Sequence, residues 1–186
     1  VYQGMGEPLN NYKAVVEAIT IMTAPPFHLS QRKITLSTVG ITHAIGKLHS
    51  DLPNINLAVS LHAPLQDVRC RIMPAARAFP LEKLMAALKE YQSKSQQKIF
   101  IEYIMLDKVN DDAEQAHQLG KLLQGFQVVV NLIPFNPIGS SCYRSSDEGK
   151  VAEFQKILRG VYEIRTTVRK QMGGDISGAC GQLVVS

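Results

Sequence analysis

Cys180 is the residue whose setting in this sequence most directly suggests chemistry. It lies in the stretch GGDISGACGQL, residues 173–183, which has neither a helical nor a strand period and little apolar surface to bury. A thiol in so bare a backbone can be an inert side chain, a metal ligand or a nucleophile. Its small neighbours, Gly178, Ala179 and Gly181, leave room for a ligand beside the sulfur and permit unusual backbone dihedrals. Choosing among these roles for Cys180 requires the residues in the rest of the chain.

Further polar side chains occur where the predicted β-strands end. They are Glu7 and Asn10, Ser37 and Thr38, Ser60 and His62, Glu102, Asp107 and Asn110, and Asn131 and Asn136. In barrels of parallel strands and helices, the chemistry gathers at the carboxyl ends of the strands. We therefore expect these side chains to converge, and such a convergence indicates a site more strongly than any single short motif.

Each of these residues also has an ordinary structural explanation. Glu7 fits a turn acid as well as a partner for the ammonium group of a ligand. Ser37 suits a helix cap as well as a ligand contact. His62 fits a satisfied structural histidine, Asn136 precedes a proline and is typical of a turn, and pairing with Arg or Lys explains Glu102 adequately.

The elements that position these residues alternate between β-rich runs and longer helical ones. Strands are predicted at 1–5, 33–40, 55–64, 98–106, 128–137 and 164–172, and helices at 11–22, 41–52, 80–95, 111–126 and 146–160, the last capped by Ser146. This alternation predicts an α/β fold with a parallel sheet covered by helices. Six strands are too few for a complete eight-stranded barrel, so we expect part of one. GxGxxG and GxxxxGK[ST] are absent, which argues against a dinucleotide fold or a P-loop.

Composition narrows the class of protein. The 186 residues are 45% hydrophobic and 19% charged, as in a folded domain, and the formal net charge of +4 permits a polyanionic partner without demanding one. Three widely separated cysteines form neither a disulfide framework nor a CxxC zinc site, which favours a reducing compartment. We find no apolar run of about 18 residues and no signal peptide. We expect a cytoplasmic protein without a membrane partner, or an organellar one if a transit peptide lies upstream.

Six segments together resemble one protein family, in this order and at these separations. They are GMGEPLNNY (4–12), ITLSTVGI (34–41), LAVSLHAP (57–64), IEYIMLDKVND (101–111), VNLIPFNP (130–137) and GGDISGACGQL (173–183). The family is the RlmN/Cfr group of radical S-adenosylmethionine (SAM) RNA methyltransferases, which modify adenine in ribosomal and transfer RNA. The resemblance runs from Val1 to the last residues and implies an enzyme that methylates C2 of an adenine.

The resemblance also implies roles for individual residues. The SAM-binding residues that it implies are Gly6, Glu7, Ser37, Ser60, Leu61, His62 and Asn136, with Glu7 on the methionyl amino group. Cys180 matches the catalytic cysteine that carries a methyl group during turnover. In the mechanism that the family implies, one SAM methylates this cysteine. An iron–sulfur cluster, reduced by an electron donor, cleaves a second SAM to a radical that activates the S-methyl group toward adenine.

The chain departs from the family in its cysteines. The family's [4Fe-4S] cluster is held by CxxxCxxC, whereas the closest two cysteines here, Cys142 and Cys180, are 38 positions apart. The first barrel strand, the resolving cysteine and the RNA-binding domain of the family would precede Val1. We therefore expect residues 1–186 to be a radical SAM core domain truncated at its N-terminus, a partial (β/α)6 barrel lacking its first strand, with the methyl-carrier loop at about 173–183. Alone, it is predicted to be inactive and to hold no metal.

Three other hypotheses stay open. The same machinery could methylate C8 of adenine, as in the Cfr branch, or the chain could be a non-catalytic remnant that binds SAM or RNA. A weaker alternative is an unrelated (β/α) enzyme with a phosphate site. Candidate RNA contacts are Arg144, Arg165, Arg169 and Lys170, although scattered solubilising charges explain them equally well. The sequence leaves the oligomeric state and the RNA position undetermined.

Overall fold

A parallel sheet forms the centre of the molecule. The computed structural model describes residues 6–136 and 142–169. Within them the sheet has five strands in the order β1-β2-β3-β4-β5, and every neighbouring pair is parallel. The strands are β1 (Thr35–Thr38), β2 (Asn56–Ser60), β3 (Ile99–Met105), β4 (Val128–Pro134) and β5 (Arg165–Val168). The predicted α/β fold with a parallel sheet is confirmed.

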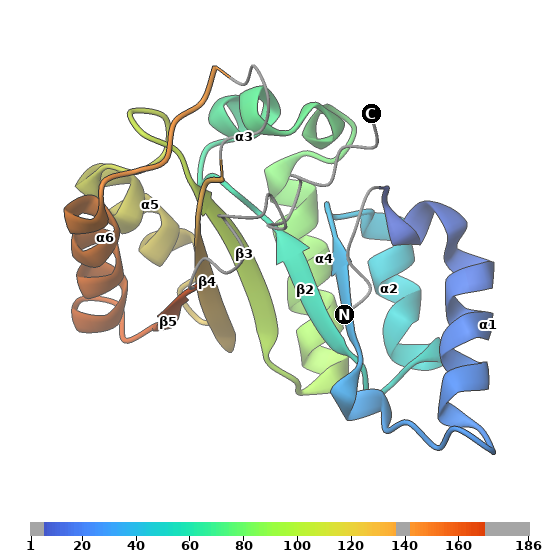
Figure 1. The fold of residues 1–186 in the computed structure, drawn as a ribbon. Helices are drawn as coiled ribbons and strands as arrows, with labels where there is room; N and C mark the ends of the chain where they lie inside the picture. Colours follow the sequence, from blue (N-terminus) through green and yellow to red (C-terminus); the bar gives the residue numbers. More distant parts are fainter. Residues whose placement is uncertain (1–5, 137–141, 170–186) are drawn as a thin grey trace.

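Helices connect these strands, because parallel neighbours need a crossover. The α-helices are α1 (Tyr12–Thr23), α2 (Thr42–Asp51), α3 (Gln66–Ile72), α4 (Leu81–Ser95), α5 (Ala113–Leu122) and α6 (Glu148–Gly160), and the 3-10 helices are η1 (Pro8–Asn11), η2 (Gln31–Lys33) and η3 (Pro74–Arg77). Figure 1 shows α1 and α2 toward the β1 edge of the sheet and α5 and α6 toward its β5 edge. None of the helices in the described residues is long and apolar enough to cross a membrane.

The two faces of the sheet have different surroundings. Along β3, Ile99, Ile101, Tyr103 and Met105 are fully buried, whereas the alternate residues, Glu102 among them, are only half-buried. Successive side chains of a strand point to opposite faces. One face therefore packs against the helices and forms the core, and within the described residues the other face is only partly covered. This one-sided burial is the pattern expected for part of a barrel, in which the helices cover only the outer face of the sheet.

The ends of the helices follow the local sequence with one correction. Asp112 begins α5 with a capping box, in which its side chain accepts a hydrogen bond from the Gln115 amide. The cap of α6 is Asp147, whose carboxylate accepts from the Gly149 amide, so the prediction of Ser146 as the cap was wrong. Ser146 is instead buried, and its hydroxyl makes no hydrogen bond. The helix begins at Glu148, so Asp147 and not Ser146 occupies the N-cap position.

Some elements differ from the expectation or lie outside the described part of the chain. Helix α3, seven residues rich in charge, was not predicted because it is too short to establish a helical period. The strand expected at 1–5 and the methyl-carrier loop at 173–183 lie outside the described residues. Five strands of the expected partial barrel are thus in view.

Candidate functional site

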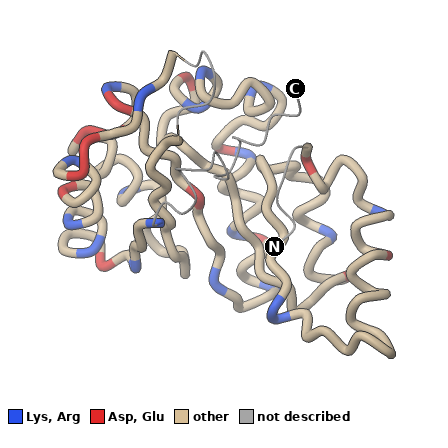
Figure 2. The backbone as a smooth tube through the Cα atoms, viewed as in Figure 1, with Lys and Arg blue, Asp and Glu red and all other residues tan. Residues whose placement is uncertain are grey.

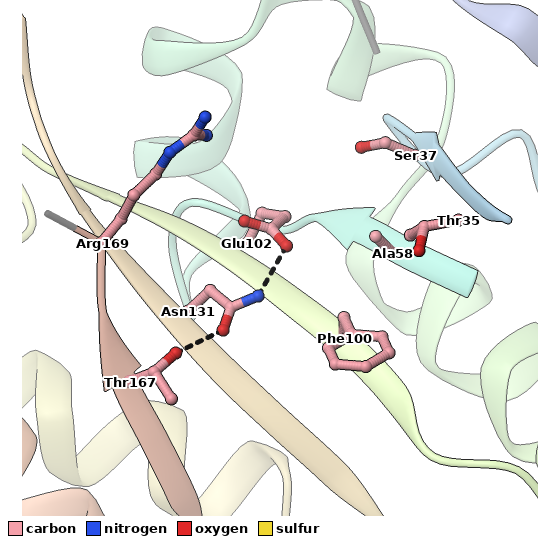
Figure 3. Close-up of a pocket in the computed structure, with 8 residues that line it drawn as sticks. All are labelled: Thr35, Ser37, Ala58, Phe100, Glu102, Asn131, Thr167 and Arg169. Atoms are coloured by element: carbon pink, nitrogen blue, oxygen red, sulfur yellow. Dashed lines mark hydrogen bonds between the residues drawn. The ribbon is translucent and has the colours of Figure 1, made fainter. Parts of the chain in front are cut away.

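A row of polar side chains crosses the open face of the sheet. The strand register places Ser60 opposite Glu102, Glu102 opposite Asn131, and Asn131 opposite Thr167. Residues in register across a sheet project from the same face. The Thr167 hydroxyl donates to Asn131 Oδ1 at 2.5 Å, and Asn131 Nδ2 donates to Glu102 Oε1 at 2.9 Å, as the dashed lines of Figure 3 show. Thr167, Asn131 and Glu102 therefore form a connected hydrogen-bond chain.

A cavity of about 390 Å³ lies over this row. Figure 3 shows its lining, with Ser37 from β1 and Phe100 and Glu102 from β3 on one side and Thr167 and Arg169 on the other. Burial raises the pKa of Glu102, and the hydrogen bond from Asn131 and the positive charge of Arg169 oppose that rise. The cavity thus contains a partly desolvated carboxyl group beside a guanidinium group.

A second cavity, of about 190 Å³, lies at the carboxyl ends of the strands. Its polar wall includes Ser37, Ser60, His62, Glu102, Asn136 and Arg169, and its apolar wall is formed by residues 104 and 133–135. The two cavities share Ser37, Glu102 and Arg169. The structure therefore brings together four residues that the sequence proposed for SAM from three separate segments, namely Ser37, Ser60, His62 and Asn136.

The side-chain oxygen of Asn136 is a buried acceptor without a hydrogen-bond donor. Its Oδ1 atom is buried and accepts no hydrogen bond, although the residue lines the smaller cavity. A buried acceptor without a donor costs free energy, on the order of 1–3 kcal/mol. A ligand with an N–H or O–H group in this cavity would remove that cost, whereas a simple turn residue would not need one.

His62 is held firmly by its neighbours. Its Nδ1 atom accepts a hydrogen bond from the Ile104 amide at 3.1 Å, and its carbonyl accepts one from Asn110 Nδ2 at 2.7 Å. The backbone of His62 is left-handed, with φ of 61°. Burial, and then the positive charge of Arg69, lower the pKa of His62 to about 4. The ring is therefore neutral near pH 7, and its proton is on Nε2, where it can serve as a donor.

Leu61 differs from its neighbours in this segment. Its side chain is fully buried in the core and lines neither of these two cavities. The amides of Leu61 and His62 donate to the Glu102 carbonyl at 3.1 and 3.3 Å. These bonds attach the end of β2 to β3. Leu61 therefore helps to fix the backbone of this segment, and its side chain makes no polar contact.

The carboxylate of Glu7 already has three donors within the protein. Its Oε1 accepts from the Leu9 amide at 3.0 Å and the Thr38 hydroxyl at 2.8 Å, and its Oε2 accepts from the Val39 amide at 2.7 Å. These bonds join η1 to the end of β1. The preceding Gly6 has φ of +106°, which favours glycine. Contact of Glu7 with a methionyl amino group stays a prediction, because Glu7 lines neither cavity.

Sequence reasoning missed part of the larger cavity. Thr35, Phe100 and Thr167 had not been proposed as site residues, although all three line it. Their alternation with buried residues, as in Thr35–Leu36–Ser37, was the available signal. Arg169 had been proposed for RNA, yet it belongs to the wall of both cavities.

The remaining predicted contacts are dispersed. Arg144 and Arg165 are exposed, and Lys170 and Cys180 lie outside the described residues. Figure 2 shows Lys and Arg mixed with Asp and Glu along the described backbone, with no basic stripe. No group of three His, Cys, Asp or Glu residues suited to a metal ion occurs within residues 6–136 and 142–169.

Two curated relatives are similar to this chain over nearly its whole length. It is 47% identical, over 185 residues or 99% of the chain, to the dual-specificity RNA methyltransferase RlmN of Syntrophobacter fumaroxidans (strain DSM 10017 / MPOB), of which it covers 54%. It is 43% identical, over 186 residues or 100% of the chain, to the probable dual-specificity RNA methyltransferase RlmN 2 of Protochlamydia amoebophila (strain UWE25), of which it covers 52%. The chain thus spans about half the length of these relatives. No protein-family model matches it.

Solved structures show the same relationship. A radical SAM methyltransferase from Sphaerobacter thermophilus superposes with a TM-score of 0.94 at 37% identity, over 97% of this chain and 53% of that one. A domain of pyruvate-formate lyase-activating enzyme from Bacteroides vulgatus ATCC 8482 superposes with a TM-score of 0.66 over 89% of this chain and 95% of that one. At 14% identity, this second likeness concerns the fold alone. The resemblance drawn from the six sequence segments is confirmed, and so is the fold class.

Proposed function

This chain is a homologue of RlmN-type radical SAM RNA methyltransferases over about half of their length, and on that premise we propose that it is the part of such an enzyme that binds SAM and carries the acceptor cysteine. The reaction proposed for the whole enzyme is methylation of adenine C2 in ribosomal and transfer RNA in the cytoplasm. Methylation at C8 instead would change the position of the product's methyl group, which mass analysis of the modified adenosine distinguishes.

The convergence on the smaller cavity carries this proposal. Ser37, Ser60, His62 and Asn136 come from three segments that the family resemblance connected with SAM, and all four residues line one cavity. The unpaired Oδ1 of Asn136 supplies an acceptor that a ligand donor, such as the amino group of an adenine ring, would satisfy. Ile104 of β3 and Ile133 and Pro134 of β4 offer an apolar wall against which such a ring can pack.

The side chains of this cavity supply binding and orientation. The neutral His62 ring offers an Nε2–H donor, and its orientation is fixed through Nδ1 by the Ile104 amide. The hydroxyls of Ser37 and Ser60 can donate or accept. Bound SAM would provide the methyl group and, in radical SAM enzymes, the precursor of the radical. Cys180, the proposed methyl carrier, lies outside the described residues, so its distance from this cavity is left open.

The [4Fe-4S] cluster of the family does not fit the cysteines of this chain. Cys70 lies in α3 and is half-buried, Cys142 is exposed, and the sequence contains no CxxxCxxC. A cluster needs several thiolates close together. We therefore assign no reaction step to a cluster bound by this chain. We propose that the cluster and the contact with an electron donor belong to the other half of the RlmN-type enzyme, which this chain does not cover. On this proposal the chain alone binds SAM and does not turn over.

Isothermal titration of the 186-residue chain with SAM tests the proposal. Asn136→Ala removes the unpaired acceptor and should weaken SAM binding about tenfold, since one hydrogen bond contributes about 1–1.5 kcal/mol. Asn54→Ala, at an exposed position away from both cavities, is the matched control and should bind like the wild type. Absence of SAM binding by the wild type, or equal affinity of Asn136→Ala and wild type, would contradict this assignment of the cavity.

A further inference from the structure

Glu102 lies where the two cavities meet, and neither the family resemblance nor the comparisons give it a role. We propose that Glu102 is a further SAM-contacting residue, whose carboxylate accepts hydrogen bonds from the ribose hydroxyls of the bound ligand. This inference rests on the proposed function, because it adds a contact to the same SAM site. Three features of the structure support it: the position of Glu102, its fixed orientation, and the chemistry of the groups on either side.

Glu102 occupies a central position in the site. Its strand, β3, is the middle strand of the five in the described sheet, and its register partners are Ser60 on β2 and Asn131 on β4. Ser37 on β1 and Asn136 after β4 lie on opposite sides of it in the strand order, and all three line the smaller cavity. A ligand that reaches from the β1 end to Asn136 therefore passes the carboxylate of Glu102.

The carboxylate is held in one orientation before any ligand arrives. Thr167 donates to Asn131 Oδ1, so the amide of Asn131 presents its Nδ2 group to Glu102 Oε1. Figure 3 shows this chain and places the Glu102 carboxylate between Asn131 and Arg169. A carboxylate fixed by such a chain loses little side-chain freedom when a ligand binds. The arrangement resembles the support that binding residues receive from groups behind them.

The chemistry of SAM selects which group meets Glu102. An ionised carboxylate only accepts hydrogen bonds, and the donors of SAM are its ammonium group, its adenine amino group and its two ribose hydroxyls. The resemblance directs the ammonium group to the Gly6–Glu7 turn, which is joined to the end of β1. The unpaired Asn136 acceptor, beyond β4, suits the adenine amino group. The ribose then lies between them, and carboxylates commonly bind ribose hydroxyls.

Titration calorimetry with paired ligands tests the contact. Wild type and Glu102→Gln are titrated with SAM, with 5′-methylthioadenosine and with the 2′,3′-dideoxy analogue of 5′-methylthioadenosine. Glu102→Gln should weaken binding of the two hydroxylated ligands about tenfold, because the amide oxygen of Gln still accepts a hydrogen bond but lacks the charge that strengthens it. Affinity for the dideoxy analogue should change less than twofold. Glu153→Gln, which removes the same charge at an exposed site on α6, is the control.

The outcomes separate this inference from the proposed function. A wild type that binds no SAM refutes both. A wild type that binds SAM, with Glu102→Gln binding it equally well, overturns only the role of Glu102. If Glu102→Gln weakens binding of the dideoxy analogue equally, Glu102 affects the cavity and does not contact the ribose hydroxyls. That result also overturns the inference. Should Glu102→Gln fail to fold, a wild type that binds the dideoxy analogue as tightly as 5′-methylthioadenosine overturns the inference, because no group then binds the ribose hydroxyls.

Discussion

Replacing Asn110 should weaken both the fold and the smaller cavity, which we propose binds SAM. Asn110 is fully buried beneath the strand ends, and its side chain makes three hydrogen bonds to backbone groups. Its Oδ1 accepts from the Leu106 amide at 2.8 Å, and its Nδ2 donates to the carbonyls of His62 and Ile104 at 2.7 and 2.6 Å. These bonds tie the left-handed residue His62 to the loop after β3.

The expected loss follows from the groups left without this partner. Asn110→Ala deprives one buried amide and two carbonyls of their hydrogen bonds, at about 1–2 kcal/mol each, so we expect a loss of about 3–5 kcal/mol in the free energy of unfolding. That is a large part of the roughly 5–15 kcal/mol typical of a domain. Asn110→Asp keeps the bond from Leu106 but presents an acceptor to two carbonyls, and it should destabilise at least as much.

Urea denaturation followed by circular dichroism at pH 7.5 measures this loss. Asn54→Ala, an exposed asparagine, should stay within about 0.5 kcal/mol of the wild type. SAM affinity of the folded Asn110→Ala fraction should also fall, because His62 is no longer held at the cavity. A loss of less than about 1 kcal/mol, or an Asn110→Asp variant as stable as the wild type, would refute the reasoning.

Two further predictions concern protonation and packing. The pKa of His62 lies near 4, below its ordinary value of about 6.5, so between these pH values the unfolded chain binds the proton more readily than the folded chain. The free energy of unfolding should therefore fall as the pH drops from about 6.5 to 4. His62→Gln should reduce this fall, which is measured by comparing urea midpoints at pH 7.5 and 4.5. A Cβ at Gly120 would overlap the Tyr162 ring, so Gly120→Ala should cost about 1–3 kcal/mol in urea unfolding. Gly46→Ala, in an exposed part of α2 with open space around it, should instead stabilise by about 0.5–1 kcal/mol, and equal effects at the two glycines would contradict the packing argument.

The sequence by itself determined the five described strands, most of the helices and the identity of the polar residues at the strand ends. These features are local, because a strand or a long amphipathic helix shows its period within about ten residues. The segments that contain Ser37, Ser60, His62 and Asn136 were connected with SAM only through their resemblance to the RlmN/Cfr group. The same local reasoning failed for α3, which is too short to show a period, and misplaced the cap of α6 by one residue.

Only the tertiary structure decided which of these residues act together. Asn131 lies 29 positions from Glu102 and 36 from Thr167, and their hydrogen bonds exist because the strand register brings them opposite one another. The sequence offered Glu7 as a turn acid or a ligand partner, whereas the fold also joins it to the Val39 amide, 32 positions away. Register and long-range hydrogen bonds depend on how whole strands pack, so no local pattern contains them.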